Sequence, residues 1–354
     1  MRVYFDAQQL YYVPQYAPLQ EVLEDSGVEC TYVFYKDLDL LKQQESVARS
    51  LKTRVLWVDN QDEAKSLYLR DKPEWLIIGN NFDDLESIHE FTKTALMSHG
   101  IGPKACYYTV SDSMPTVRFT EGPYRTQRLQ ELYPSSEFID VGYAKLDPIV
   151  QGRKLASLEQ YGLDTNKKTI LYAPTFYPSS IECIPDNFPK EYSEYNIIVK
   201  PHYFSLANPK YKKQKSKLLK WSKFENVYLA GIDDVNILPF MSVSDLLISD
   251  ASSTLFEFAA LDKPIVWCDF FKLRFGYRGL FRFRFNKRMD QDLYKYADIA
   301  IHAKNYTELK QQVVSQIEYP EEFQDNRRKY TLALAGNVDG QVSSKIAQFL
   351  LSRG

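Results

Sequence analysis

Short runs of β-branched and aromatic residues alternate with longer polar stretches along almost the whole 354-residue sequence. A first series of runs covers residues 2–5, 30–35, 53–58, 75–79, 95–99, 105–109 and 138–141, and a second covers 169–173, 196–200, 227–230, 246–249, 264–268 and 299–302. Strands separated by helical stretches predict βαβ units and parallel sheets. Two such series predict an α/β chain with two Rossmann-like halves facing each other across a cleft.

The domain boundary is expected near residues 143–153, where the first series ends. A charged segment, residues 153–161, follows it and is predicted as an amphipathic helix. We therefore divide the chain into an N-terminal domain, residues 1–150, and a C-terminal domain, residues 151–330. Residues 331–354 are expected to form a helical segment that packs back on the N-terminal domain.

Composition and the N-terminus favour a soluble, cytoplasmic protein. No apolar run approaches the roughly 18 residues that span a membrane, and the first residues lack the apolar core of a secretory signal. The four cysteines, Cys30, Cys106, Cys183 and Cys268, lie too far apart for a CxxC pair and indicate reduced thiols.

The basic residues are unevenly distributed. Residues 210–223 and 270–288 each carry seven Lys or Arg and no acid, so they hold 14 of the 44 basic residues. Such clusters indicate an anionic partner. The stretch from Lys210 to Lys223 fits either a helix on an anionic membrane or a solvated helix docked on its own domain.

The second basic stretch alternates cations with aromatic residues. This pattern suits stacking on nucleic acid, and it equally fits a half-buried strand or loop beside a phosphate-rich substrate. Between these two interpretations we favour the phosphate-rich substrate, and we expect no nucleic-acid partner.

Four predicted strand ends carry groups suited to phosphate or proton chemistry. One ends at His99-Gly100, one at Pro174-Thr175, one at Lys200-Pro201-His202, and one at Ser249-Asp250. Ligands of such folds bind beyond the carboxyl ends of the strands.

The last of these ends carries a hydroxyl cluster. Ser252 or Ser253 can cap a helix predicted from Thr254 to Leu261, whose free amides favour a phosphate. Plain N-capping by Ser or Asp accounts for most sequences of this kind.

Two of the four histidines are candidates for proton transfer. His99 and His202 end strands in different halves, and imidazole is well matched to proton transfer near neutral pH. His89, in a predicted helical run over residues 85–95, and His302, at a late strand end, are interpreted as structural.

The order of these elements resembles the CDP-glycerol glycerophosphotransferase family, of the teichoic-acid and capsule type. The resemblance covers roughly residues 95–268. Its motifs are the His99-Gly100 loop, residues 141–147, residues 170–175, Lys200-Pro201-His202, residues 248–253 with Phe256-Glu257, and Lys263-Pro264-Ile265.

The resemblance implies a GT-B fold and a transferase acting on a CDP-alcohol. It would move a polyol phosphate, with glycerol phosphate the expected group, to a hydroxyl of a cell-surface glycan or lipid-linked acceptor and release CMP. The N-terminal domain would then be the acceptor side and the C-terminal domain the nucleotide-donor side. The enzyme would work in the cytoplasm, at the inner face of the membrane if the lysine cluster binds lipid.

By matching position, the resemblance also assigns site residues. His99 would be the general base on the acceptor hydroxyl, and His202 would contact the donor phosphates. Ser252 and Ser253 would bind the donor phosphate, and the further expected nucleotide or phosphate contacts are Thr175, Lys200, Asp250, Thr254 and Glu257.

No metal or other cofactor is expected. The Asp-x-Asp pairs at residues 37–39 and 290–292 have metal-binding spacing, but neither follows a predicted strand of the cleft. Two other functions remain open: a GT-B glycosyltransferase that uses a nucleotide sugar, and a non-catalytic protein that binds a polyanion through residues 270–288.

Overall fold

The computed structural model describes residues 1–103, 108, 114–277, 279 and 291–354. By internal contacts the chain divides into two compact units. The first unit comprises residues 1–152 and 332–354, and the second comprises residues 153–331.

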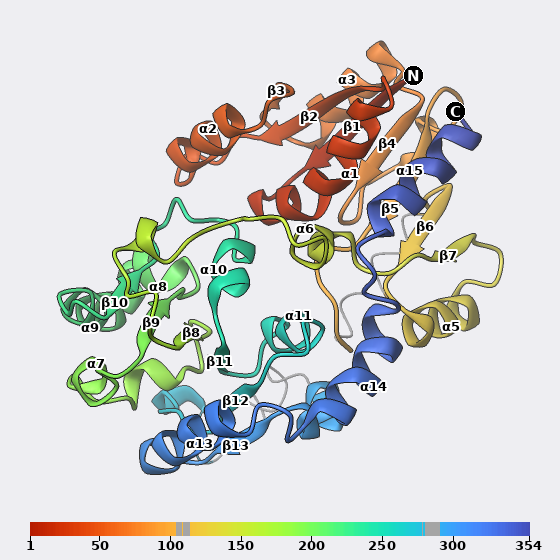
Figure 1. Cartoon of the computed structure of the whole chain (residues 1–354). Coiled ribbons are helices and arrows are strands. Elements are labelled where there is room, and N and C mark those ends of the chain that lie inside the picture. Colours follow the sequence, from red (N-terminus) through yellow and green to blue (C-terminus); the bar gives the residue numbers. More distant parts are fainter. Residues whose placement is uncertain (104–107, 109–113, 278, 280–290) are drawn as a thin grey trace. The chain divides into compact units, whose positions relative to one another are not determined.

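The first unit is built on a seven-stranded parallel sheet of order β3-β2-β1-β4-β5-β6-β7 (Figure 1). Its strands are β1 (Arg2–Ala7), β2 (Glu29–Tyr35), β3 (Arg54–Val58), β4 (Trp75–Ile78), β5 (Lys93–Met97), β6 (Val117–Thr120) and β7 (Phe138–Asp140). Its α-helices are α1 (Val13–Asp25), α2 (Leu41–Ser50), α3 (Gln61–Asp71), α5 (Pro123–Leu132), α6 (Asp147–Val150) and α15 (Val342–Ser352).

The second unit holds a six-stranded parallel sheet of order β10-β9-β8-β11-β12-β13. Its strands are β8 (Thr169–Ala173), β9 (Asn196–Val199), β10 (Val227–Leu229), β11 (Leu246–Ser249), β12 (Ile265–Cys268) and β13 (Ile301–Ala303). Its helices are α7 (Phe188–Glu191), α8 (Phe204–Ala207), α9 (Lys212–Trp221), α10 (Leu238–Val243), α11 (Thr254–Ala259) and α13 (Tyr306–Glu318); α14 (Gln324–Ala335) leads back to the first unit.

The central strands are apolar because helices cover both faces of each sheet. Every residue of β4, Trp-Leu-Ile-Ile, and every residue of β12, Ile-Val-Trp-Cys, is buried. Strands buried on both faces read as continuous apolar runs, with no alternation of polar residues. The predicted α/β class with two Rossmann-like sheets is therefore confirmed.

Several local predictions were wrong. Residues 153–161 form only a short 3-10 turn, Glu159–Tyr161, and Gly162 follows it at φ +69°. The predicted helix around His89 is a 3-10 turn, Leu85–Ser87, before β5. Strand β6 was missed, and the run predicted at residues 105–109 lies outside the described residues except for Tyr108.

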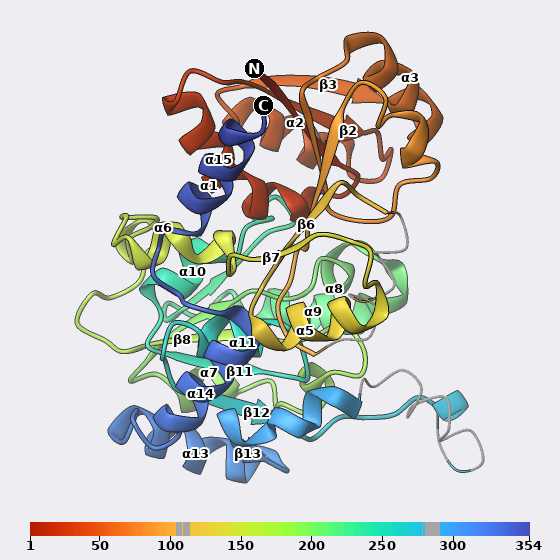
Figure 2. The ribbon, with the colours of Figure 1, turned by 90° about the vertical axis from the view of Figure 1, so that its right-hand side faces the viewer.

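The C-terminal helix α15 packs beside α1 on the first sheet, as both ribbon views show (Figures 1 and 2). The indole Nε1 of Trp75, on β4, donates to the carbonyl oxygen of Leu350 at 3.2 Å. The first turn of α15 is capped by a distant carboxylate, since Asp147 accepts from the backbone N–H groups of Val342 (3.3 Å) and Ser343 (2.7 Å). Residues almost 200 positions apart are thus joined in one unit.

We predict that Asp147→Ala lowers the free energy of unfolding by about 1–3 kcal/mol. The substitution leaves two buried helix N–H groups without acceptors, and unmet buried donors cost about this much. Chemical denaturation of the variant measures the loss. Glu137→Ala is the matched control. Among the described residues it removes an exposed ion pair with Arg353, for which about 0–1 kcal/mol is expected. Equal losses in both variants would contradict the capping role of Asp147.

Candidate active site

The second sheet brings three of the predicted strand ends together. Strands β9, β8 and β11 are neighbours, and the strand order reverses between β8 and β11. At such a reversal the loops leave in opposite directions and open a crevice at the carboxyl ends of the strands. Thr175 follows β8, Lys200 and His202 follow β9, and Asp250 follows β11.

A pocket of about 250 Å³ lies at this reversal. Two of the predicted residues, Thr175 and Asp250, line it. The others are mostly aromatic or apolar and were not predicted: Phe176, Tyr177, Pro178, Ala251, Cys268, Phe271 and Tyr294. A pocket of aromatic walls with a few polar groups is typical of small-molecule sites.

The carboxylate of Asp250 organises the loop that forms one wall of this pocket. It accepts from the backbone N–H of Thr175 (3.0 Å) and of Ser180 (3.1 Å), and from the hydroxyls of Ser179 (3.2 Å) and Thr175 (3.3 Å). Burial raises the pKa of Asp250 to about 6, although these hydrogen bonds oppose the shift. Asp250 therefore supports the loop over residues 175–180.

His202 is held as a neutral imidazole. Its Nδ1 accepts from the backbone N–H of Phe204 at 3.2 Å, so the ring proton sits on Nε2. The ring packs against Phe176, Tyr203 and Phe204, with centroids 4.6–5.0 Å apart. Burial, and then the charge of Lys200, lowers the pKa of His202 to about 4. At neutral pH His202 is thus a hydrogen-bond donor through Nε2.

The hydroxyl cluster after β11 lies at the same carboxyl edge. The Ser252 hydroxyl accepts from the backbone N–H of Thr254 at 3.1 Å, and Ser253 makes no side-chain cap to α11. Both serines and Thr254 are half-buried, whereas Glu257 is buried within the helix. Helix α11 ends at Ala259, two residues earlier than expected.

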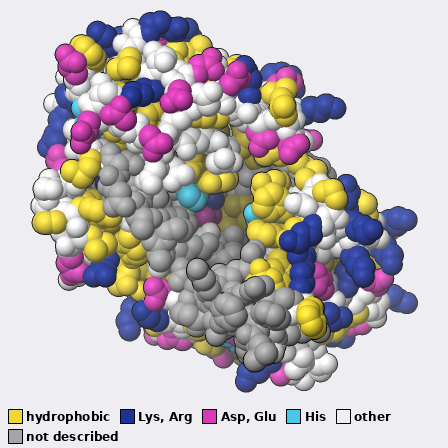
Figure 3. Space-filling model, turned by 180° about the vertical axis from the view of Figure 1, so that it is seen from behind, with side chains coloured by type: hydrophobic (Ala, Val, Ile, Leu, Met, Phe, Trp, Pro, Cys, Tyr) yellow, Lys and Arg dark blue, Asp and Glu magenta, His cyan; other side chains and the backbone are white. Residues whose placement is uncertain are grey.

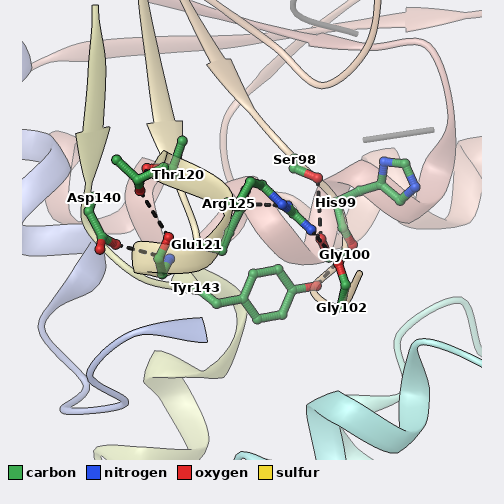
Figure 4. A network of polar contacts seen from close by, with 11 residues as sticks. Ser98, His99, Gly100, Gly102, Thr120, Glu121, Arg125, Asp140 and Tyr143 are labelled. Carbon is green, nitrogen blue, oxygen red and sulfur yellow. Dashed lines mark hydrogen bonds and ion pairs between the residues drawn. The ribbon is translucent and has the colours of Figure 1, made fainter. Parts of the chain in front are cut away.

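His99 belongs to the first unit, two residues beyond β5. Its ring packs against both Tyr11 and Tyr12, with centroid distances of 4.7 and 5.1 Å, and these two tyrosine rings also contact each other at 4.8 Å. Its backbone carbonyl accepts from the Tyr143 hydroxyl at 2.9 Å (Figure 4). The sequence indicated the glycine-containing loop but neither tyrosine neighbour of the ring.

The other two histidines have structural partners. His89 Nε2 lies 2.7 Å from the hydroxyl oxygen of Thr94. His302 contacts Asp269 through Nδ1 (2.6 Å) and the Ala297 carbonyl through Nε2 (2.9 Å). Burial opposes the charged form of His302, but the hydrogen bonds to Asp269 and Ala297 outweigh it and raise the pKa.

One cation beside the pocket was not singled out from the sequence. The guanidinium of Arg274 lies over the rings of Tyr177 (4.4 Å) and Tyr211 (4.9 Å), and its backbone N–H donates to the Tyr177 hydroxyl at 2.8 Å. Only its place in the second basic stretch pointed to it. Residues 278 and 280–288 of that stretch, which include the alternating run 281–285, lie outside the described residues.

The first basic stretch forms α9, which is docked on its own unit. Leu218 and Trp221 are buried in the core, and Lys217 donates to the carbonyls of Ile181 (3.1 Å) and Ile184 (2.5 Å). On the outer face of α9, exposed lysines surround Leu219. Figure 3 shows Lys and Arg side chains gathered at the right-hand edge of the molecule in that view. None of the described helices is long and apolar enough to cross a membrane.

Metal ligands do not gather among the described residues, which contain no group of three or more His, Cys, Asp or Glu side chains with suitable geometry. Asp37 instead accepts from the backbone N–H of Asp39 at 3.0 Å. Asp290 lies outside the described residues.

Known proteins resemble this chain in sequence and in fold. Residues 117–352 match the family of CDP-glycerol:poly(glycerophosphate) glycerophosphotransferases. A teichoic acid glycerol-phosphate primase from Bacillus spizizenii is 31% identical over 138 residues, which are 37% of this chain and 33% of the primase. The alignment thus spans about a third of that relative's length.

Solved structures show the fold. The wall teichoic acid polymerase TagF superposes with a TM-score of 0.70 at 14% identity, covering 99% of this chain and 88% of TagF. UDP-GlcNAc 2-epimerase from Neisseria meningitidis superposes with a TM-score of 0.65 at 14% identity, covering 99% of this chain and all of the epimerase chain. Together with the two parallel sheets, these similarities confirm the expected GT-B fold.

The family match includes the whole second unit and every candidate residue on it, whereas His99 precedes the matched residues. The expected family is therefore confirmed over two thirds of the sequence. The chain belongs to the CDP-glycerol:poly(glycerophosphate) glycerophosphotransferase family.

Proposed function

We propose that this protein transfers glycerol phosphate from CDP-glycerol to a hydroxyl group of a glycan or lipid-linked acceptor. The acceptor oxygen attacks the phosphorus that carries glycerol, and the bond from that phosphorus to the bridging oxygen breaks. The electron pair leaves with CMP, and the proton of the acceptor hydroxyl passes to His99. Atoms and charge balance without a further reactant.

The family match over residues 117–352 carries this proposal. It includes both the Lys200-Pro201-His202 segment and the segment from Asp250 to Thr254, which flank β8 at one edge of the sheet. We assign donor binding to the second unit, whose bounds, residues 153–331, are close to those of the expected donor domain, residues 151–330. We assign acceptor binding to the first unit.

On the donor side, neutral hydrogen-bond donors and nearby cations suit a diphosphate. His202 offers Nε2–H, and the hydroxyls of Ser252, Ser253 and Thr254 lie at the neighbouring strand end. Such preorganised donors favour charge that develops on a leaving phosphate. Lys200 adds a positive charge beside His202.

Assaying nucleotide release tests the reaction class. Purified protein is incubated with CDP-glycerol, CDP-ribitol and a panel of nucleotide sugars, each with a lipid analogue that ends in glycerol phosphate. Release of CMP dependent on this acceptor supports the proposal. Release of a nucleoside diphosphate would indicate glycosyl transfer, and no release from any donor would indicate a binding protein.

We predict that His99→Ala lowers turnover by about two to four orders of magnitude at saturating CDP-glycerol. This is the range expected when a positioned general base is removed. CMP release measures turnover, and a thermal melt checks folding. His89→Ala is the control, because His89 contacts only Thr94 among the described side-chain hydrogen bonds. Near-normal turnover of folded His99→Ala would exclude His99 as the base.

We predict that CDP protects the protein against thermal unfolding and that the Ser252→Ala/Ser253→Ala variant loses this protection. Ligand at a hundredfold excess over its Kd stabilises a folded protein by about 2.7 kcal/mol. The control is Ser193→Ala/Ser222→Ala, whose serines precede β9 and β10 at the opposite edge of the sheet. Unchanged CDP affinity in the Ser252/Ser253 variant would remove these hydroxyls from the donor site.

We also propose that the outer face of α9 binds the anionic inner surface of the cytoplasmic membrane, where a lipid-linked acceptor is accessible. Each Lys near such a surface contributes about 1 kcal/mol. Lys212, Lys215, Lys220 and Lys223 line a shallow hollow around Leu219, which is 48% exposed. Hydrophobic contact through Leu219 and charge attraction would act together.

Co-sedimentation with vesicles tests this surface. We predict binding to phosphatidylglycerol vesicles but not to phosphatidylcholine vesicles, weakening with salt because exposed charges are screened within about 8 Å at physiological ionic strength. Reversal of Lys212, Lys213, Lys215 and Lys223 to Glu should abolish binding. The control reverses four exposed lysines elsewhere: Lys42, Lys52, Lys154 and Lys329. Equal loss in both variants, or binding to neutral vesicles, would contradict a specific face.

A further inference from the structure

The loop that carries His99 is held by its backbone carbonyl groups. Three of them, at His99, Gly100 and Gly102, accept hydrogen bonds from side chains (Figure 4). The donors come from other parts of the first unit, Arg125 on α5 and Tyr143 after β7, and from Ser98 within the loop. The loop conformation therefore depends on side chains 20 to 45 positions away.

Arg125 makes two of these contacts with one planar group. Its guanidinium donates to the carbonyl of Gly100 at 3.2 Å and to that of Gly102 at 2.8 Å. A rigid guanidinium fork can span two acceptors in fixed geometry, which the single ammonium of Lys cannot. Gly102 has φ +108°, a conformation that favours glycine, so the second carbonyl is presented by an unusual backbone turn.

The charge of Arg125 is balanced by Glu121, four residues earlier in the segment between β6 and α5. Both side chains are only 2% exposed, and they form a salt bridge. Removing two charges from water costs more than their attraction returns unless further hydrogen bonds are made. Here Arg125 makes those further hydrogen bonds to the carbonyl groups of the His99 loop. The buried Arg125–Glu121 pair is therefore stabilised by its contact with the loop.

Tyr143, three residues after β7, fixes the same loop. Its side chain is 2% exposed, and its hydroxyl donates to the His99 carbonyl at 2.9 Å. The residue before it, Gly142, has φ +100°, and a Cβ there would lie 2.9 Å from Val342. The Tyr143 hydroxyl thus holds the backbone carbonyl of His99, and the close packing at Gly142 fixes the chain next to Tyr143.

We infer that Arg125 and Tyr143 are positioning residues for the imidazole of His99. They contact the backbone of the loop, and through it they keep the His99 ring in place against Tyr11 and Tyr12. The inference rests on the proposed role of His99 as the base. A displacement of about 1 Å in a catalytic group can reduce turnover about a hundredfold.

Two conservative variants test the inference by kinetics with CDP-glycerol and the glycerol-phosphate lipid analogue. Tyr143→Phe removes one hydroxyl, and Arg125→Lys keeps the charge opposite Glu121 while breaking the double contact. We expect kcat to fall about 10-fold to 100-fold in each, with KM for CDP-glycerol unchanged. Arg128→Lys is the control, since Arg128 lies on the same helix and its one ion pair among the described residues is with Glu131 on the surface. The kcat of this variant should not change.

A double-mutant cycle separates positioning from general stabilisation. Residues that act through one group are not additive. In a His99→Ala background, Tyr143→Phe should therefore cause no further loss of turnover. A further loss equal to that in the wild-type background would overturn the inference. Tyr143→Phe, which removes a single oxygen, keeps the test decisive if Arg125→Lys does not fold.

Failure of the inference and failure of the proposed function give different results. If His99→Ala retains turnover, His99 is not the base. If His99→Ala is inactive but Tyr143→Phe and Arg125→Lys keep full kcat, the base stands and the positioning role is excluded.

Discussion

The candidate chemistry depends on the parallel hydrogen bonding of the two sheets. Parallel strands end at one edge, and helices that cross over the sheet must return the chain to the opposite edge. In the second unit this places the residues after β8, β9 and β11 next to one another, although they are 25 to 75 positions apart in the sequence. The pocket at Thr175 and Asp250 follows from that geometry. The backbone topology thus sets the position of the crevice, and the side chains that line it determine its shape and polarity.

Each unit uses a buried charge to shape the loop beside its candidate site. In the second unit Asp250 accepts four hydrogen bonds from the loop over residues 175–180, and in the first Arg125 donates to the loop over residues 98–102. The two buried groups carry opposite charges, but each one fixes a loop through several hydrogen bonds. A buried charge is costly unless its hydrogen bonds are met, so the surrounding backbone has few alternative conformations.

The sequence predicted the sheets well because the strands are buried on both faces. Runs such as Trp75-Leu76-Ile77-Ile78 consist entirely of apolar residues, so their burial can be predicted from the sequence. Strand β6 was missed because Arg118, a charged residue that is 1% exposed, interrupts its apolar pattern. Residues 153–161 have helical spacing, but burial in the folded chain, which spacing alone does not reveal, is what stabilises most helices.

The candidate site was predictable only in part. Strand-end position identified Thr175, His202 and Asp250, and the family resemblance gave them expected roles. The actual contacts of Asp250, and those of Arg125 and Tyr143, join residues that are distant in sequence, so no local pattern contains them. The aromatic wall at Tyr294 belongs to a 3-10 segment that gave no signal for a site.

The return of the chain through α14 to α15 has a consequence for synthesis on the ribosome. The first unit begins at residue 1, but α15, which provides the partner for Trp75 and receives the cap from Asp147, is made after the whole second unit. Domains generally fold as units while the chain emerges. Residues 153–331 can therefore complete their core first, while the side of α1 that binds α15 stays uncovered until α15 itself has been made. Of the two units, the one whose first strand is made earlier is therefore the one completed later.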